Sequence, residues 1–248
     1  MKTLKLTLIC LFFSAIAFAN ISKTEKEALL ALYNSTQGEQ WNNKWDLNTP
    51  VNIWYGVVIK NDAVIEINLT FNNLQGTLPQ ELGNLKALKK LNLGLNKLEG
   101  SIPSAIGNLK NLEKLSLFSN KFSGVIPLEI TVLANLQVLE LGSNFLTGTI
   151  PAEINNLKRL KVLSLMDNKL EGHIPVEITD LVYLEELILA ENQLTGTLPI
   201  QLSNLNNLNT LMVSDNNLNS DYVSVINNEE SIKKVTIDIK DTYVVERD

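Results

Sequence analysis

The chain has almost none of the residues that build reactive or metal-binding centres. Its 248 residues include one cysteine, Cys10, and one histidine, His173. With so few, neither a disulfide within the chain, nor a zinc site, nor Cys/His catalysis can be assembled. A glycine-rich phosphate loop and a GxSxG nucleophile elbow are also missing from the sequence. We therefore expect no catalytic residue, no cofactor and no metal site.

Positive charge is also scarce. The sequence has 21 Lys and Arg against 27 Asp and Glu, a net charge of -6, and no basic stripe. Such a chain is a poor match for nucleic acid, because binding to phosphates requires positive charge. We expect no nucleic-acid partner.

The longest apolar run is short and lies at the N-terminus. Lys2 and Lys5 precede an apolar stretch over residues 6–18, and Ala17-Phe18-Ala19 fits the small-residue cleavage rule. A spanning helix needs about 20 apolar residues, so an uncleaved anchor is the less favoured alternative. Residues 1–19 are predicted to be a signal peptide, which implies a secreted or cell-surface protein without stable membrane insertion after cleavage.

A 24-residue repeat organises the rest of the sequence. Proline and glycine recur with the same period as a series of asparagines, and leucine or isoleucine fills the intervals in the order L-x-x-L-x-L-x-x-N-x-L-x-G-x-I-P. A repeat of this length predicts a solenoid, in which each unit buries its apolar residues only against its neighbours. The asparagines are Asn72, Asn96, Asn120, Asn144, Asn168, Asn192 and Asn216.

This unit resembles the plant-type leucine-rich repeat, which is found in receptor-kinase ectodomains and polygalacturonase-inhibiting proteins. The resemblance implies an α/β solenoid: a right-handed superhelix with a parallel, concave β-sheet, an irregular or 3₁₀ convex side and an N-terminal helical cap. Trp54-Tyr55-Gly56-Val57 is similar to the W-x-G-V element of the plant-type cap, but Asn52 and Ile59 stand where that pattern has cysteines. The difference suits a bacterial secreted relative.

The physical chemistry of the unit agrees with the resemblance. Alternation in Leu91-Asn92-Leu93 predicts a short strand with its leucines inward. A buried asparagine can pair backbone groups that the following bend leaves without partners. After Pro103 we expect a 3₁₀-like return over residues 104–109. Repeats should occupy residues 64–218, in about seven units.

Both ends of the solenoid need caps. Residues 20–63 are predicted to form the N-terminal cap, with a capping box of Ser22 and Glu25 starting a helix. Its tryptophans are expected in the core, with an exposed sugar platform as the alternative. Residues 219–248 are predicted to be a degenerate last repeat and C-terminal cap, with Val235 and Ile237 in strand register.

Outward positions of consecutive strands should line up on the concave face, where this family usually binds protein or peptide ligands. Apolar side chains on this face resemble binding hot spots, although scattered surface hydrophobics are also normal. The candidate ligand-binding residues, including six apolar ones expected to be exposed, are Phe71, Leu95, Phe118, Glu140, Met166, Asp167, Glu186, Ile188, Glu191, Met212 and Asp215.

Asp167, Glu191 and Asp215 fall in one column, for which three interpretations remain open. An acidic patch selecting a basic partner is favoured over a calcium site and over a glycosidase pair. A further column with Thr77, Thr149 and Thr197 suggests ice or glycan binding, but glutamates interrupt the adjacent column.

The sequence therefore predicts an extracellular or cell-surface recognition module, not an enzyme, that binds a protein or peptide through its concave face. A carbohydrate- or calcium-dependent surface-binding protein and a structural adhesin of the envelope are the alternatives, so a glycan remains a candidate partner.

Overall fold

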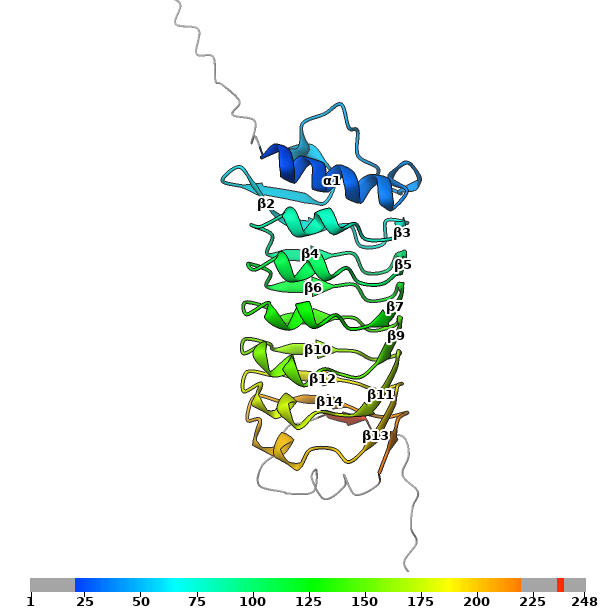
Figure 1. Ribbon diagram of the computed structural model, residues 1–248, viewed down its shortest axis with the longest axis vertical. Coiled ribbons are helices and arrows are strands. Elements are labelled where there is room, and N and C mark those ends of the chain that lie inside the picture. Colours follow the sequence, from blue (N-terminus) through cyan, green and yellow to red (C-terminus); the bar gives the residue numbers. More distant parts are fainter. Residues whose placement is uncertain (1–20, 220–235, 239–248) are drawn as a thin grey trace, which may run out of the picture.

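The computed structural model describes residues 21–219 and 236–238, which form one solenoid. Its coils stack along the long axis, with the helix α1 (Lys23–Ser35) across the first coil (Figure 1). Each coil adds one strand to a main sheet, one to a second sheet and one 3₁₀ turn. The repeat architecture predicted from the 24-residue period is confirmed.

The main sheet contains nine of the described strands. All pair in parallel except β1 and β2, which form an antiparallel hairpin. Strands β4 to β14 pair residue for residue at the repeat period, so equivalent side chains of successive coils are neighbours. Their bounds are β1 Val57–Lys60, β2 Ala63–Asn68, β4 Lys90–Asn92, β6 Lys114–Ser116, β8 Val138–Glu140, β10 Val162–Ser164, β12 Glu186–Ile188, β14 Thr210–Met212 and β16 Thr236–Asp238.

A second parallel sheet runs along one side of the solenoid, and the sequence did not predict it. We call it the lateral sheet; it has seven described strands and is seen nearly edge-on at the right of Figure 1. The strands are β3 Gln75–Gly76, β5 Lys97–Gly100, β7 Lys121–Val125, β9 Phe145–Gly148, β11 Lys169–His173, β13 Gln193–Gly196 and β15 Asn217–Leu218.

The expected 3₁₀ return is confirmed in every described repeat that carries the proline. Each proline precedes a five-residue 3₁₀ turn and has extended backbone, as at Pro103 with φ -70° and ψ 139°. The turns are η3 Gln80–Asn84, η4 Ser104–Asn108, η5 Leu128–Val132, η6 Ala152–Asn156, η7 Val176–Asp180 and η8 Ile200–Asn204; two shorter ones in the cap are η1 Gly38–Gln40 and η2 Val51–Ile53.

Leucine and isoleucine from every coil form one continuous core, and the asparagine series lies at its edge. Leu91 and Leu93 are fully buried, as the alternation predicted. The Asn120 side-chain amide donates to the carbonyl oxygens of Leu93 and Leu117, both at 3.0 Å, and its Oδ1 accepts from the Leu98 N–H at 2.9 Å. Each asparagine thus links its own coil to the coil before it.

The capping box of α1 is confirmed and also ties the cap to the first repeat. The Glu25 N–H donates to Ser22 Oγ, and the Ser22 N–H donates to Glu25 Oε2, both at 3.2 Å. The other carboxylate oxygen of Glu25 accepts from the Val64 N–H at 3.0 Å. One buried carboxylate therefore closes the helix and holds the start of the repeat region.

Four aromatic rings fill the space between α1 and the first coil. Trp45 stacks on Trp54 with 4.7 Å between ring centroids and lies 4.9 Å from Trp41 and 5.9 Å from Tyr33. The three indoles are 3–4% exposed and each donates its N–H to a backbone carbonyl. Their prediction as core is confirmed, and an exposed sugar platform is excluded.

The β1–β2 hairpin completes the cap. Asn61 and Asp62 at its turn have φ of 51° and 55°, the left-handed pair typical of a type I′ turn. Gly56, in the W-x-G-V element, has φ 76°, and a Cβ there would lie 2.0 Å from the Asn68 carbonyl oxygen. Only glycine fits where the hairpin backbone passes this close.

The predicted strand near the C-terminus is present but shifted. Strand β16 places Ile237 opposite Leu211, where the 24-residue period predicted Val235, so the expected register is wrong by two residues. The longer connection after β14 lacks the G-x-I-P segment that sets the length of the other coils. The rest of the predicted C-terminal cap and the predicted signal peptide lie outside the described residues.

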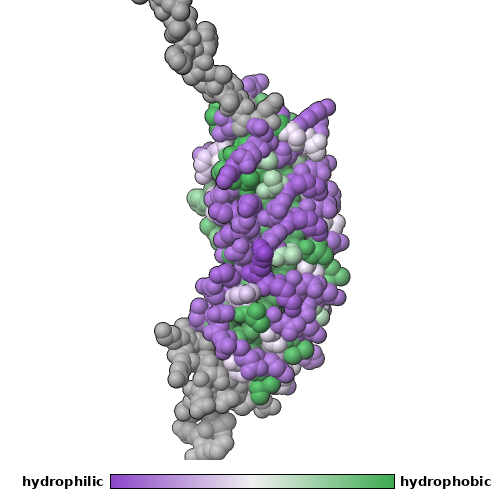
Figure 2. Space-filling model, turned by 90° about the vertical axis from the view of Figure 1, so that its left-hand side faces the viewer, coloured by the Kyte–Doolittle hydropathy of each residue, from purple (hydrophilic) through white to green (hydrophobic). Residues whose placement is uncertain are grey.

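The side of the solenoid opposite the lateral sheet is formed by the loops that lead from the 3₁₀ turns to the strands. Figure 2 shows this side, where hydrophilic residues predominate and hydrophobic residues are scattered among them. Scattered hydrophobics of this kind are normal for a soluble surface.

Candidate binding face

The outward side chains of the main sheet and of the turn that follows each strand form a continuous surface, which we call the sheet face. All eleven predicted ligand-binding residues lie on it, in four neighbouring columns. Glu140, Ile188 and Met212 share one column through the pairing of β8, β10, β12 and β14. Glu186 lies on β12 in the next column. The columns after the strand hold Phe118 and Met166, then Phe71, Leu95, Asp167, Glu191 and Asp215.

The expectation that six apolar residues are exposed is correct for only two of them. Phe71 is 74% exposed and Leu95 45%. Phe118, Met166, Ile188 and Met212 are half-buried. They lie on a strand or directly after it, where neighbouring coils cover their flanks; the ring of Phe118, for example, leans over Gly94 in the preceding coil.

The outermost column has a backbone feature that the sequence analysis missed. Phe71, Leu95, Asp167, Glu191 and Asp215 have φ between 53° and 56°, the left-handed region that L side chains seldom adopt. Serine takes this conformation at the equivalent places in the other two coils. The signal in the sequence was the position itself, directly before the asparagine that recurs every 24 residues, where the chain bends out of the strand.

We expect Phe71→Asn to raise the free energy of unfolding by about 1 kcal/mol, because asparagine tolerates the left-handed conformation. The ring is largely exposed, so little packing is lost. Urea unfolding followed by circular dichroism measures the change. Phe145→Asn is the matched control, since this half-exposed phenylalanine lies in β9 with Lys169 Nζ 5.4 Å from its ring centroid. A loss of stability in Phe71→Asn would show that the ring packs in the folded state.

Ion pairs neutralise the N-terminal half of the sheet face. Lys90 Nζ lies 3.4 Å from Glu66, and Lys114 Nζ lies 2.9 Å from Glu140. At the edge of the main sheet, Lys89 pairs with Glu113 at 2.7 Å. Glu140 is thus already occupied by a lysine of the preceding coil, which weakens its candidacy as a ligand contact.

In the C-terminal half, Glu185 at the sheet edge also pairs with a lysine, Lys161, at 2.8 Å, but the candidate ligand-binding carboxylates do not. Within residues 21–219 and 236–238, no lysine or arginine pairs with Asp167, Glu186, Glu191 or Asp215. The same residues contain no group of three or more His, Cys, Asp or Glu that could hold a metal ion. The column is therefore a spread acidic surface, and its geometry supplies no calcium cage.

One buried polar atom lies within the ion-paired N-terminal half. Ser116 on β6 is fully buried, and its Oγ is the one side-chain atom of the described residues found buried without a hydrogen-bond partner. It precedes Phe118 by two residues, and its neighbour across the sheet is Glu140. Its neighbours on the two adjacent strands, Asn92 and Glu140, are both polar.

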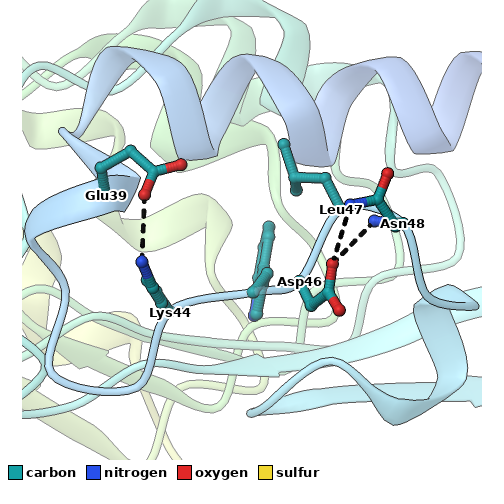
Figure 3. Close-up of a pocket in the computed structure, with 6 residues that line it drawn as sticks. Glu39, Lys44, Asp46, Leu47 and Asn48 are labelled. Carbon is teal, nitrogen blue, oxygen red and sulfur yellow. Dashed lines mark hydrogen bonds and ion pairs between the residues drawn. The ribbon is translucent and has the colours of Figure 1, made fainter.

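A depression of about 580 Å³ lies in the N-terminal cap, away from the sheet face, and is lined by Glu39, Lys44, Trp45, Asp46, Leu47 and Asn48 (Figure 3). Its polar groups pair with one another: Lys44 Nζ lies 3.2 Å from Glu39, and Asp46 Oδ1 accepts from the Asn48 N–H at 3.0 Å. Burial, followed by a hydrogen bond and the charge of Glu39, raises the pKa of the neighbouring Tyr33. With its charges satisfied, this depression offers no reactive group.

Comparison with known proteins identifies the repeat. Family profiles described as leucine rich repeat match residues 64–122, 135–157, 159–181 and 183–205, together just over half of the chain. No curated protein matches the sequence.

Solved structures of plant proteins share the fold. The chain is 31% identical to the receptor in the PEPR1–AtPEP1 crystal structure, with a TM-score of 0.76 over 87% of this chain and 31% of the other. It is 29% identical to a plant ice-binding protein, with a TM-score of 0.73 over 80% of this chain and 65% of the other. It is 34% identical to the Arabidopsis thaliana receptor kinase HAESA, which was solved with the peptide hormone IDA and the co-receptor SERK1. The TM-score is 0.60 over 70% of this chain and 30% of the other. The chain thus spans about a third of the length of these receptors.

Proposed function

Because this chain belongs to the leucine-rich-repeat family, we propose that it is an extracellular recognition module that binds a protein or peptide through its sheet face. The observation that carries the proposal is the alignment of Phe118, Met166, Ile188 and Met212, half-buried apolar side chains on one ordered surface. Apolar anchors ringed by polar groups are typical of binding hot spots. The receptor HAESA, of similar fold, was solved with a peptide hormone, which supports a ligand of this class.

The proposal includes secretion or display at the cell surface. It rests on the predicted signal peptide over residues 1–19 and on the likeness to receptor ectodomains. In the part of the chain that the structure describes, no helix has the length and apolar character needed to cross a bilayer.

A randomised peptide library displayed on phage and selected against the purified protein tests the function. We expect selected peptides to lose at least about tenfold in affinity when Phe118, Met166 and Ile188 are all changed to alanine, since truncating one hot-spot residue costs 2 kcal/mol or more. Isothermal titration calorimetry measures the affinities.

The matched control changes Leu128, Val176 and Ile200 to alanine. These residues are 54%, 49% and 61% exposed and recur at one position of the 3₁₀ turns, on another side of the solenoid. Binding should be unchanged in the control. Enrichment of no peptide, or loss of binding in the control alone, would refute the sheet face as a peptide-binding surface.

Ice is a second candidate ligand, favoured by the similarity to a plant ice-binding protein. The lateral sheet offers the regular surface, with Thr149 and Thr197 at equivalent positions. Charged Glu99, Lys121 and Glu171 interrupt that array, so we favour the sheet face and its peptide ligand. An assay of ice recrystallisation separates the two candidates, because inhibition at micromolar protein would require an ice-binding surface.

A further inference from the structure

The C-terminal half of the sheet face combines apolar side chains with unbalanced negative charge. Met166, Ile188 and Met212 come from three successive coils and are half-buried. Ile188 and Met212 are direct neighbours in the pairing of β12 with β14. Adjacent strands lie about 4.8 Å apart, and Met166 lies diagonally from Ile188, two residues beyond Ser164, which pairs with Ile188. We call these three side chains the apolar strip.

Carboxylates flank this strip on both sides. Glu186 lies two residues before Ile188 on β12, while Asp167, Glu191 and Asp215 follow the strands in the left-handed column. Asp167, Glu191 and Asp215 are exposed, Glu186 is half-buried, and none of the four has a cationic partner among the described residues. In the N-terminal half, by contrast, Glu66 and Glu140 are paired with lysines.

On the sheet face, carboxylates are thus paired with lysines in the N-terminal half and unpaired among the described residues of the C-terminal half. From this difference, and resting on the proposed function, we propose that the C-terminal half of the sheet face binds an extended peptide segment carrying lysine or arginine beside apolar residues. The apolar side chains of the segment cover Met166, Ile188 and Met212 and exclude water there. Its cationic groups pair with the flanking carboxylates, which have no cationic partner among residues 21–219 and 236–238. An acidic segment on the same strip would place like charges together, which is unfavourable at such distances.

The spacing of the carboxylates sets the spacing of the cations. Asp167 and Asp215 are two strand spacings apart, about 10 Å at their backbones. An extended peptide rises about 3.3 Å per residue and alternates its side chains between two faces. Basic residues four positions apart therefore share a face about 13 Å apart at their backbones, and their long side chains can reach both carboxylates. The apolar residues of the segment then fall between them, over the strip.

Three synthetic twelve-residue peptides test the charge preference. They share two leucines and differ in carrying three lysines, three glutamates or three serines at the same positions. We expect the lysine peptide to bind at least about tenfold more tightly than the glutamate peptide, and its affinity to fall as salt is raised, because exposed charges are screened. Fluorescence anisotropy at two ionic strengths measures both effects.

Matched variants separate a local site from the general attraction of an acidic protein. The test variant carries Asp167→Asn, Glu191→Gln and Asp215→Asn; the control carries Glu129→Gln, Glu153→Gln and Glu177→Gln. The control carboxylates also recur every 24 residues, but lie on the 3₁₀ turns η5, η6 and η7. Both variants have the same net charge. The lysine peptide should lose about tenfold in affinity for the test variant and less than twofold for the control.

Two results would overturn the inference. One is an equal loss in the test and control variants, which would assign the effect to net charge. The other is the selection of library peptides that have no basic residues but still lose binding when Phe118, Met166 and Ile188 become alanine. The proposed function would then stand without the preference for basic peptides. Failure of every peptide to bind the sheet face would refute both proposals.

Discussion

Replacing Asn144 with aspartate should lower the free energy of unfolding by about 3–5 kcal/mol, although the two side chains have the same shape. The Asn144 amide donates to the carbonyl oxygens of Leu117 at 3.1 Å, Leu141 at 2.9 Å and Gly142 at 3.1 Å. An aspartate has no N–H groups to donate and brings a carboxylate oxygen against three carbonyls. Asn144 is 5% exposed, and each buried group left without a partner costs about 1–3 kcal/mol.

Urea unfolding followed by circular dichroism measures this loss. Asn156→Asp is the control, because Asn156 ends the turn η6 with its side chain exposed, and surface substitutions of this kind are usually within about 0.5 kcal/mol of the parent. Similar stabilities for the two variants would mean that the hydrogen bonds of the asparagine series contribute little to the free energy of unfolding. A loss confined to the coils around Asn144, seen by hydrogen exchange, would agree with the nearest-neighbour energetics of repeat proteins.

Replacing Trp45 with alanine should cost about 3–5 kcal/mol, the usual loss for a large buried aromatic. Its ring contacts the other three aromatics of the cap, and its Nε1 donates to the Tyr55 carbonyl oxygen at 2.8 Å. Loss of the cap would expose the apolar end of the first coil. We therefore expect concentration-dependent association by size-exclusion chromatography together with a lower melting temperature.

Two substitutions act as controls for Trp45. Trp45→Phe keeps an aromatic ring but loses the indole hydrogen bond, and should cost less than half as much as alanine. Tyr55→Ala removes a side chain that is 49% exposed and should change stability by less than about 1 kcal/mol. A monomeric Trp45→Ala protein of parental stability would show that α1 and the hairpin cap the solenoid without the aromatic cluster.

The main features of the fold could be predicted because the same pattern of apolar residues, asparagine, glycine and proline recurs in each 24-residue unit. Alternation around Leu91 and Leu93 predicts a strand, and the asparagine at each bend predicts a side chain that pairs with backbone groups. The lateral sheet escaped prediction, since segments such as Lys97–Gly100 form strands only when the next coil supplies their partners. The shift at Ile237 escaped for a related reason: the connection before it lacks the G-x-I-P segment, so the period no longer applies.

The sequence predicted which residues of the candidate site lie in the same column, but not their exposure or their ion pairs. Alignment of equivalent positions placed Asp167, Glu191 and Asp215 together, because the period fixes which side chains are neighbours. Whether a carboxylate is paired depends on side chains in adjacent coils, as with Lys114 and Glu140. The left-handed backbone of the outer column is likewise set by the bend and not by residue type, because Phe71 and Leu95 adopt it at the same position as the serines.

Each coil places one strand in the main sheet and one in the lateral sheet, and this has a consequence for how such a protein can change its length. Insertion of a whole 24-residue unit adds one strand to each sheet and one asparagine to the series, and it leaves the contacts between all other neighbouring coils in place. Insertion of a single residue breaks the alignment of all three at once. The sheet face can therefore be lengthened or shortened in increments of one strand spacing, about 4.8 Å, so chains that differ by whole units would present the same surface over different lengths.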